Sequence, residues 1–279
     1  MDDSRTMPRL CFIITLALAV IGTALRSVCM FCCFDADPGY FSPGILPTLS
    51  DILYFVAVAV AITCAALTPK HRLTTELHTP YRAPFSILLG VSLAAFTIAS
   101  LLIWFPARKS DIMIAPAILG LLASTYYFLS CNRNGRYPDW LSLVGYLPVL
   151  WSLSAVAETY FDLYTVMNSP VKVSLQMGFL GFALIGLAEL RFRVGRATPR
   201  YSLALVSIGS FTCLMGAIPV LIATGAQILK NLPHLLYAVV LLFVGLYGFY
   251  ILFHITFSPV AETDEASSPV TPEFPNDVA

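Results

Sequence analysis

The sequence has little charge. Only 11% of its 279 residues are Asp, Glu, Lys or Arg and 58% are hydrophobic, whereas soluble domains contain about 25% charged residues. A soluble domain needs charged side chains to cover its surface, and a disordered chain contains few hydrophobic ones. The composition therefore excludes a soluble enzyme and a disordered protein. Basic and acidic residues balance at 16 each, so no excess positive charge is available for binding a nucleic acid.

The sequence also lacks the short motifs of common active sites. It contains no Walker A loop, no GxSxG elbow, no HExxH pair and no dinucleotide-binding glycine pattern. We therefore predict no catalytic residue, no cofactor and no metal site. Cys29, Cys32 and Cys33 are interpreted as small buried hydrophobic residues, because a zinc site would need Asp35 or Asp37 as its fourth ligand.

Long apolar stretches account for most of the chain. About 20 apolar residues in a helix cross the hydrocarbon core of a bilayer, and no segment alternates polar and apolar residues over the length of a strand. We predict an all-α integral membrane bundle of about eight transmembrane helices within residues 1–259, with the lipid bilayer as its surroundings. The predicted spans are 10–34, 52–67, 85–105, 112–129, 140–161, 171–190, 201–226 and 235–257.

The basic residues beside the spans predict the orientation. Roughly twice as many Lys and Arg lie on the side of the N-terminus as on the other side, and basic loops stay in the cytoplasm. We predict a multi-pass protein of the cell membrane with both termini in the cytoplasm. Residues 260–279, which are acidic and rich in Pro and Ser, are predicted to form a disordered cytoplasmic tail. The alternative is a first span cleaved as a signal peptide, which would leave seven spans.

Small residues and prolines predict how the helices pack. Without a hydrophobic driving force in lipid, close helix contacts depend on small side chains. Two stripes at four-residue spacing are therefore interpreted as helix contacts: Ala57, Ala61 and Ala65 in the second span, and Gly209, Cys213 and Ala217 in the seventh. Pro148 and Pro219 lie inside predicted spans and are expected to kink them.

Polar residues at the predicted outer ends of three spans form the first candidate site. Ionisable groups within a bilayer are costly and often functional. The candidates are Arg26, Glu158, Asp162, Asn168, Lys172 and Gln176. We predict that they line one outward-facing vestibule that binds a polar small solute, with Arg26 paired to Glu158 or Asp35. The alternative is that they lie in the headgroup zone, where charge is tolerated.

Arginines near the predicted inner end of the sixth span form the second candidate site. Glu189 and Arg193 are four residues apart, a spacing that favours an ion pair on a helix surface. Four arginines are candidate ligands for anionic lipid headgroups: Arg191, Arg193, Arg196 and Arg200. Anchoring of the topology is the alternative interpretation.

Three segments resemble a group of bacterial polytopic membrane proteins of about this length. They are DADPGY at residues 35–40, MNSPVK at 167–172 and ELRFRVGR at 189–196. The group has no assigned activity, so the resemblance implies a multi-span membrane protein and transfers no functional residue.

Three functions are compatible with a chain that consists mostly of spans. The first is a small-molecule permease or transport component that binds its solute near Arg26 and Glu158. The second is a sensor or assembly subunit that docks a membrane partner protein and uses the acidic tail. The third is an intramembrane lipid-modifying enzyme, for which Glu158, Asp162 and Glu189 are the candidate carboxylates.

Overall fold

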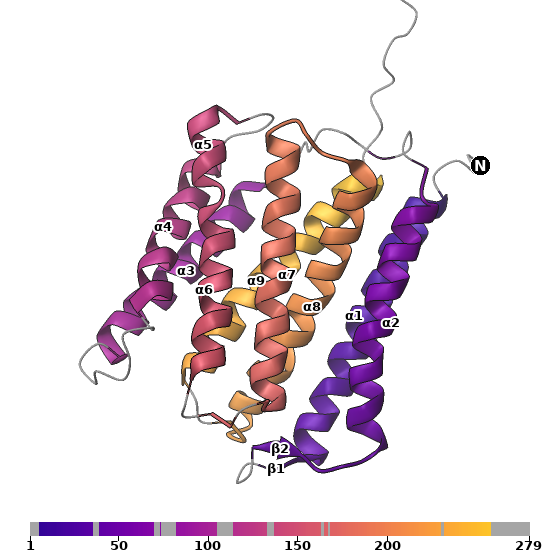
Figure 1. The fold of residues 1–279 in the computed structure, drawn as a ribbon, viewed down its shortest axis with the longest axis vertical. Helices are drawn as coiled ribbons and strands as arrows, with labels where there is room; N and C mark the ends of the chain where they lie inside the picture. Colours follow the sequence, from indigo (N-terminus) through magenta and orange to yellow (C-terminus); the bar gives the residue numbers. More distant parts are fainter. Residues whose placement is uncertain are drawn as a thin grey trace, which may run out of the picture.

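The computed structural model describes residues 6–35, 39–69, 73, 82–104, 114–132, 137–162, 165–166, 168–229 and 232–257. Helices make up nearly all of this part (Figure 1). They are α1 (Thr6–Cys32), α2 (Ile45–Leu67), α3 (Arg82–Trp104), α4 (Ile114–Ser130), α5 (Asp139–Val144), α6 (Leu147–Phe161), α7 (Pro170–Arg193), α8 (Pro199–Gly225) and α9 (Leu232–Phe257). A short hairpin of β1 (Phe34–Asp35) and β2 (Tyr40–Phe41) follows α1. The predicted all-α bundle is confirmed. The predicted tail lies outside the described residues.

The described chain passes along the bundle eight times. Seven segments are long and apolar enough to cross a membrane, and α4 is a shorter apolar helix of 17 residues. Successive passes alternate in direction, so the start of α1 and the end of α9 lie at the same end (Figure 1). There the guanidinium of Arg9 lies 5.5 Å from the ring centroid of Phe257. Because the start of α1 and the end of α9 lie at the same end of the bundle, the described chain makes an even number of passes.

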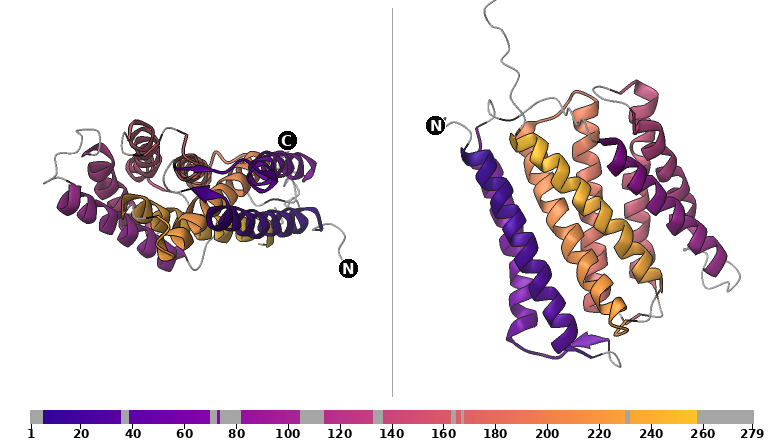
Figure 2. Two further views of the ribbon diagram at one scale, coloured as in Figure 1. Left: turned by 90° about the horizontal axis from the view of Figure 1, so that it is seen from below. Right: turned by 180° about the vertical axis from the view of Figure 1, so that it is seen from behind.

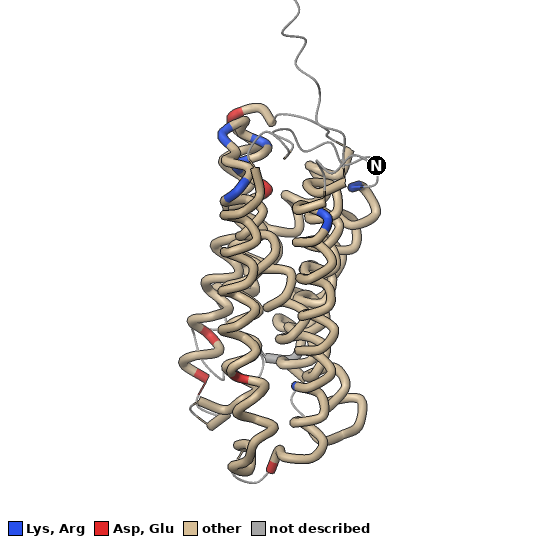
Figure 3. The backbone as a smooth tube through the Cα atoms, turned by 90° about the vertical axis from the view of Figure 1, so that its right-hand side faces the viewer, with Lys and Arg blue, Asp and Glu red and all other residues tan. Residues whose placement is uncertain are grey.

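Most Lys and Arg of the described residues gather at the end where α1 begins and α9 ends, which we call the basic end (Figure 3). The β1–β2 hairpin lies at the opposite end (Figure 1). The predicted orientation would place the basic end in the cytoplasm. That assignment stays a prediction.

The predicted fifth span consists of two helices instead of one kinked helix. α5 ends at Val144 and α6 begins at Leu147, with Pro148 in the first turn of α6. Proline is tolerated there because the first turn of a helix has backbone N–H groups without intrahelical acceptors. Pro219, in contrast, lies inside α8.

The helices form an elongated bundle whose centre is α7, α8 and α9 (Figure 2). α1 and α2 pair at one edge and contact α8, while α3 and α4 pair at the other edge. Both predicted stripes of small residues are buried, which confirms them as packing surfaces. α7 and α8 approach so closely that a Cβ atom on Gly209 would lie 2.5 Å from the carbonyl oxygen of Gly181.

We expect Gly181→Ala to destabilise the protein by about 1–3 kcal/mol, the usual cost of overpacking a close-packed contact. The new methyl group would overlap Thr212 Oγ1 and lie 2.8 Å from the carbonyl oxygen of Gly209. Thermal unfolding in detergent measures the effect. Gly225→Ala at the end of α8 is the control, because its Cβ would meet no atom within 4 Å. Equal melting temperatures for the two variants would contradict the close crossing.

Candidate functional site

Arg26 is buried near the end of α1 and forms an ion pair across to α2. Its side chain is 3% exposed, and Nη1 lies 2.8 Å from Oδ1 of Asp51, whose side chain is 62% exposed. Among the described residues, the partner of Arg26 is therefore Asp51, and the predicted pairing with Glu158 or Asp35 is wrong. The reason is geometric: α1 pairs with α2, which brings the first turns of α2 beside the last turns of α1.

The remaining contacts of Arg26 are longer than its bond to Asp51. Nε and Nη2 donate to Ser174 Oγ at 3.3 and 3.2 Å, Nη1 donates to Ser50 Oγ at 3.4 Å, and Nη2 donates to the carbonyl oxygen of Pro170 at 3.4 Å. The β1–β2 hairpin adds the ring of Phe41, whose centroid lies 4.7 Å from the guanidinium carbon. The four hydrogen-bond distances exceed the usual N–H···O value of about 2.9–3.0 Å. The guanidinium is thus held loosely by α7 and firmly only by Asp51.

Arg26 faces a pocket between α1, α2 and α7, which we call the Arg26 pocket. Its volume is about 330 Å³, near the lower end of the roughly 300–1,000 Å³ of ligand pockets. Arg26, Phe41, Asp51, Tyr54, Asn168 and Ser174 are among its lining residues. The hydroxyl of Tyr54 is buried and has no hydrogen-bond partner among the described residues. A buried hydroxyl without a partner costs free energy unless a ligand or water satisfies it.

The other predicted vestibule residues lie on the far side of α7. Lys172 is two positions from Ser174, which corresponds to about 200° around a helix. Its Nζ donates to the carbonyl oxygen of Asp162 at 2.7 Å, so Lys172 holds the connection between α6 and α7. Gln176 is half-buried two positions after Ser174 and thus also points away from the Arg26 pocket. Within the described residues, the predicted vestibule is therefore divided, and only Arg26 and Asn168 share the pocket.

Glu158 is buried within α6, four residues before Asp162. Its side-chain oxygen Oε2 has no hydrogen-bond partner within the described part of the chain. The Thr165 hydroxyl donates to Asp162 Oδ2 at 2.6 Å. Glu158 therefore belongs to the α6–α7 side and is not part of the Arg26 pocket.

A second buried ionic cluster lies at the basic end and joins four helices. Arg82 of α3 donates from Nη2 to Glu189 Oε1 of α7 at 2.6 Å. It also donates to the Ser130 carbonyl oxygen of α4 at 2.6 Å and to the Tyr247 hydroxyl of α9 at 3.1 Å. Arg193 Nε lies 3.8 Å from the same Glu189 oxygen. We call Arg82, Ser130, Glu189, Arg193 and Tyr247 the buried clamp.

Tyr137 closes the clamp from the segment before α5. Its ring centroid lies 5.4 Å from the Arg82 guanidinium carbon and 5.2 Å from that of Arg193. Burial, and then the Glu189 carboxylate, raise the pKa of the Tyr137 phenol, while the two arginines act in the opposite direction. The phenol therefore stays protonated at neutral pH, and the ring acts through its π face.

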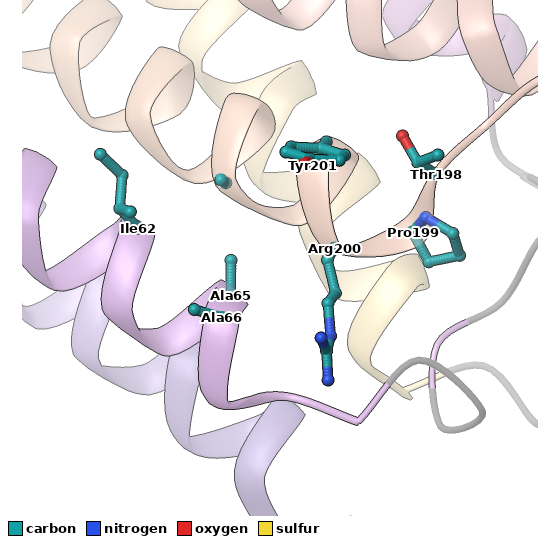
Figure 4. A pocket seen from close by; sticks show the side chains of 8 residues that line it. Ile62, Ala65, Ala66, Thr198, Pro199, Arg200 and Tyr201 are labelled. Carbon is teal, nitrogen blue, oxygen red and sulfur yellow. The ribbon is translucent and has the colours of Figure 1, made fainter.

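The four arginines predicted to bind lipid headgroups occupy different environments. Arg193 is 1% exposed and belongs to the clamp, so it does not face lipid headgroups and the interpretation of this residue is wrong. The spacing of Glu189 and Arg193 does bring their charges together, but inside the bundle instead of on a helix surface. Arg191 and Arg196 are exposed. Arg200 is half-buried and extends from the start of α8 toward the end of α2 (Figure 4).

Three important residues escaped the interpretation of the sequence. Asp51 lies directly before the predicted span 52–67, and Arg82 lies just before the predicted span 85–105, so both fall outside the predicted membrane segments. Tyr54 lies within the predicted span 52–67, where an aromatic residue is expected and does not indicate a binding site. A usable signal for Arg82 was present, because a predicted span begins three residues later, and an arginine so placed needs a partner when it is buried.

No protein-family model matches this chain, and no curated protein or solved structure is significantly similar to it. A functional assignment therefore depends on geometry. The geometry gives a multi-pass helical membrane bundle with an open pocket around a buried arginine at one end and a buried ionic clamp at the other.

Proposed function

We propose that this protein binds a small zwitterionic solute in the Arg26 pocket and acts as a permease or as a component of a transport system. One observation carries the proposal: the buried guanidinium of Arg26 lines an open cavity together with Tyr54, whose buried hydroxyl has no hydrogen-bond partner among the described residues. A pocket with few, convergent polar groups is the usual form of a small-molecule site.

The pairing of Arg26 with Asp51 favours a zwitterion over a simple ion. The two charges are 2.8 Å apart, so an anion attracted to Arg26 would be repelled by Asp51, and a cation would meet the reverse. A solute with both a carboxylate and an ammonium group replaces the internal pair by two ion pairs without changing the net charge of the site. Asp51 is exposed enough to turn toward such a ligand.

The distribution of strong contacts suggests which part of the bundle moves. The buried clamp ties α3, α4, α7 and α9 together through hydrogen bonds of 2.6–3.1 Å. The α1–α2 pair instead meets α7 at the Arg26 pocket through hydrogen bonds of 3.2–3.4 Å from Arg26 to Ser174 and Pro170. At the basic end α2 is joined to α8, because Arg200 Nε donates to the carbonyl oxygen of Thr68 at 2.7 Å. We therefore expect the α1–α2 pair to move away from α7 at the Arg26 pocket when solute enters or leaves, while its basic end stays attached to α8.

Tyr54→Phe should weaken solute binding about two- to tenfold, the value of one hydrogen bond. The substitution removes only a hydroxyl that has no hydrogen-bond partner among the described residues, so the stability of the solute-free form should not fall. Purified protein is tested by thermal shift with a panel of zwitterionic amino acids. Each amino acid is compared with analogues that carry only one of its two charges. The analogues of alanine are propionate, which lacks the ammonium group, and ethylamine, which lacks the carboxylate.

Tyr237→Phe is the matched control. The Tyr237 hydroxyl is also buried without a partner among the described residues, but this residue does not line the Arg26 pocket. Its substitution should leave solute-dependent stabilisation unchanged. The proposal fails if no zwitterion stabilises the protein more than its singly charged analogues, or if the two tyrosine variants bind alike.

A further inference from the structure

A second pocket lies at the basic end, between the end of α2 and the start of α8 (Figure 4). Its volume is about 400 Å³. The α2 side is lined by Ile62, Ala65 and Ala66, and Ala204 contributes from α8. We call it the α2/α8 pocket. It is separate from the Arg26 pocket, which lies near the opposite end of α1 and α2.

One rim of the α2/α8 pocket is cationic and rich in hydrogen-bond donors. Arg200 Nε donates to the carbonyl oxygen of Thr68 at 2.7 Å. This bond holds the guanidinium beside the end of α2 and does not use its two terminal nitrogens. Thr198 also lines the pocket. The first turn of α8 adds backbone N–H groups and the positive end of the helix dipole.

The walls are apolar and open sideways to the surroundings of the bundle. Ile62 is 53% exposed and Tyr201 is 68% exposed, and both line the pocket. α2 and α8 are both long and apolar enough to cross a membrane, so exposed apolar side chains on them meet hydrocarbon. Tyrosine is enriched at the level of lipid headgroups. In a bilayer crossed by α2 and α8, the cationic rim would lie at headgroup depth and the apolar walls deeper.

We propose that the α2/α8 pocket binds an anionic phospholipid, with its phosphate at Arg200 and one acyl chain along Ile62, Ala66 and Ala204. Charge complementarity selects the headgroup, because a guanidinium binds phosphate through paired hydrogen bonds. The apolar walls select a lipid over a free phosphate ion, which would gain nothing from them. The bound lipid bridges the ends of α2 and α8, which Arg200 and Thr68 already join.

Native mass spectrometry of the full-length protein in detergent, titrated with dioleoyl phosphatidylglycerol, tests the proposal. Arg200→Gln should weaken lipid binding about fivefold, the value of one basic side chain at an anionic surface. Arg191→Gln is the matched control, because it removes the same charge from an exposed arginine at the end of α7 that does not line the pocket. If Arg200→Gln and Arg191→Gln lose the same affinity for phosphatidylglycerol, the lipid responds only to the charge of the surface, and the proposal is overturned.

A second variant tests the pocket without changing charge. Ala66 is exposed and lines the wall, so Ala66→Phe should fill the groove while the fold survives. We expect it to weaken phosphatidylglycerol binding although Arg200 is intact; unchanged binding would overturn the proposal. Phosphatidylcholine should bind more weakly than phosphatidylglycerol. Glycerol 3-phosphate at the same concentration should not compete, and competition by it would show a site for soluble anions instead.

Discussion

Replacing Glu189 by glutamine will lower the free energy of unfolding by about 3–5 kcal/mol, the cost of breaking a buried ion pair by removing one partner. The carboxylate is 3% exposed and lies between two guanidinium groups that are each 1% exposed. Glutamine keeps the size and one oxygen but removes the charge. Arg82 and Arg193 would then face each other in a region of low dielectric constant.

Equilibrium unfolding in mixed micelles measures this loss, and Glu158→Gln is the matched control. Both glutamates are buried within a helix of the bundle. Glu158 differs because its Oε2 has no hydrogen-bond partner among the described residues, and its substitution removes no ion pair that the structure records. We expect Glu158→Gln to leave stability unchanged or to raise it. If the two variants lose the same stability, the clamp does not hold the helices together.

The membrane spans were predictable because the bilayer imposes one simple requirement. A segment that crosses hydrocarbon must be apolar over a fixed length and must satisfy its backbone groups internally. The break between Val144 and Leu147 was not predictable in the same way. A helix interrupted close to its start has the same hydropathy as a continuous one, and Pro148 fits both a kink and a helix start.

The ion pairs were harder to predict because they depend on how each helix is rotated about its axis. Arg26 and Asp51 come from neighbouring helices, whereas Arg82 and Glu189 are separated by 107 positions in sequence. Arg82 lies outside the predicted spans, but the packing of α3 against α4 and α9 buries it. Only a pair within one helix, Glu189 with Arg193, follows from spacing alone.

The predicted vestibule shows the same limit on one helix. Lys172 and Ser174 both lie in the first turns of α7, and composition alone gives no reason to separate them. Two positions correspond to about 200°, so Ser174 reaches Arg26 while Lys172 reaches the carbonyl oxygen of Asp162. Residues at the same depth in a membrane therefore need not share a cavity.

Arg26→Gln should weaken zwitterion binding by about 10- to 100-fold, because a hydrogen bond to a charged group contributes about 1.5–3 kcal/mol. The loss of stability should be small, in contrast to Glu189→Gln. Asp51 is 62% exposed, so removing Arg26 leaves its carboxylate in contact with water instead of buried and unpaired. A loss of binding would thus reflect the site and not the fold.

Arg26→Lys separates charge from geometry. Arg26 contacts Asp51 on α2 and Ser174 on α7 with different nitrogens, and a single ammonium group cannot reproduce this planar fork. We therefore expect Arg26→Lys to bind the solute more weakly than the wild type and more strongly than Arg26→Gln. Glu158→Gln should bind normally, because α7 separates Glu158 from the pocket.

Uptake into proteoliposomes extends the comparison from binding to transport, with the zwitterion that gives the largest thermal stabilisation as the labelled solute. If transport goes through the Arg26 pocket, the rate of uptake should decrease in the same order as the affinity, from wild type to Arg26→Lys to Arg26→Gln. Binding that follows this order without any uptake would restrict the protein to solute recognition. Wild-type affinity in Arg26→Gln would mean that the guanidinium only holds α1, α2 and α7 together, and the proposed function would then be wrong.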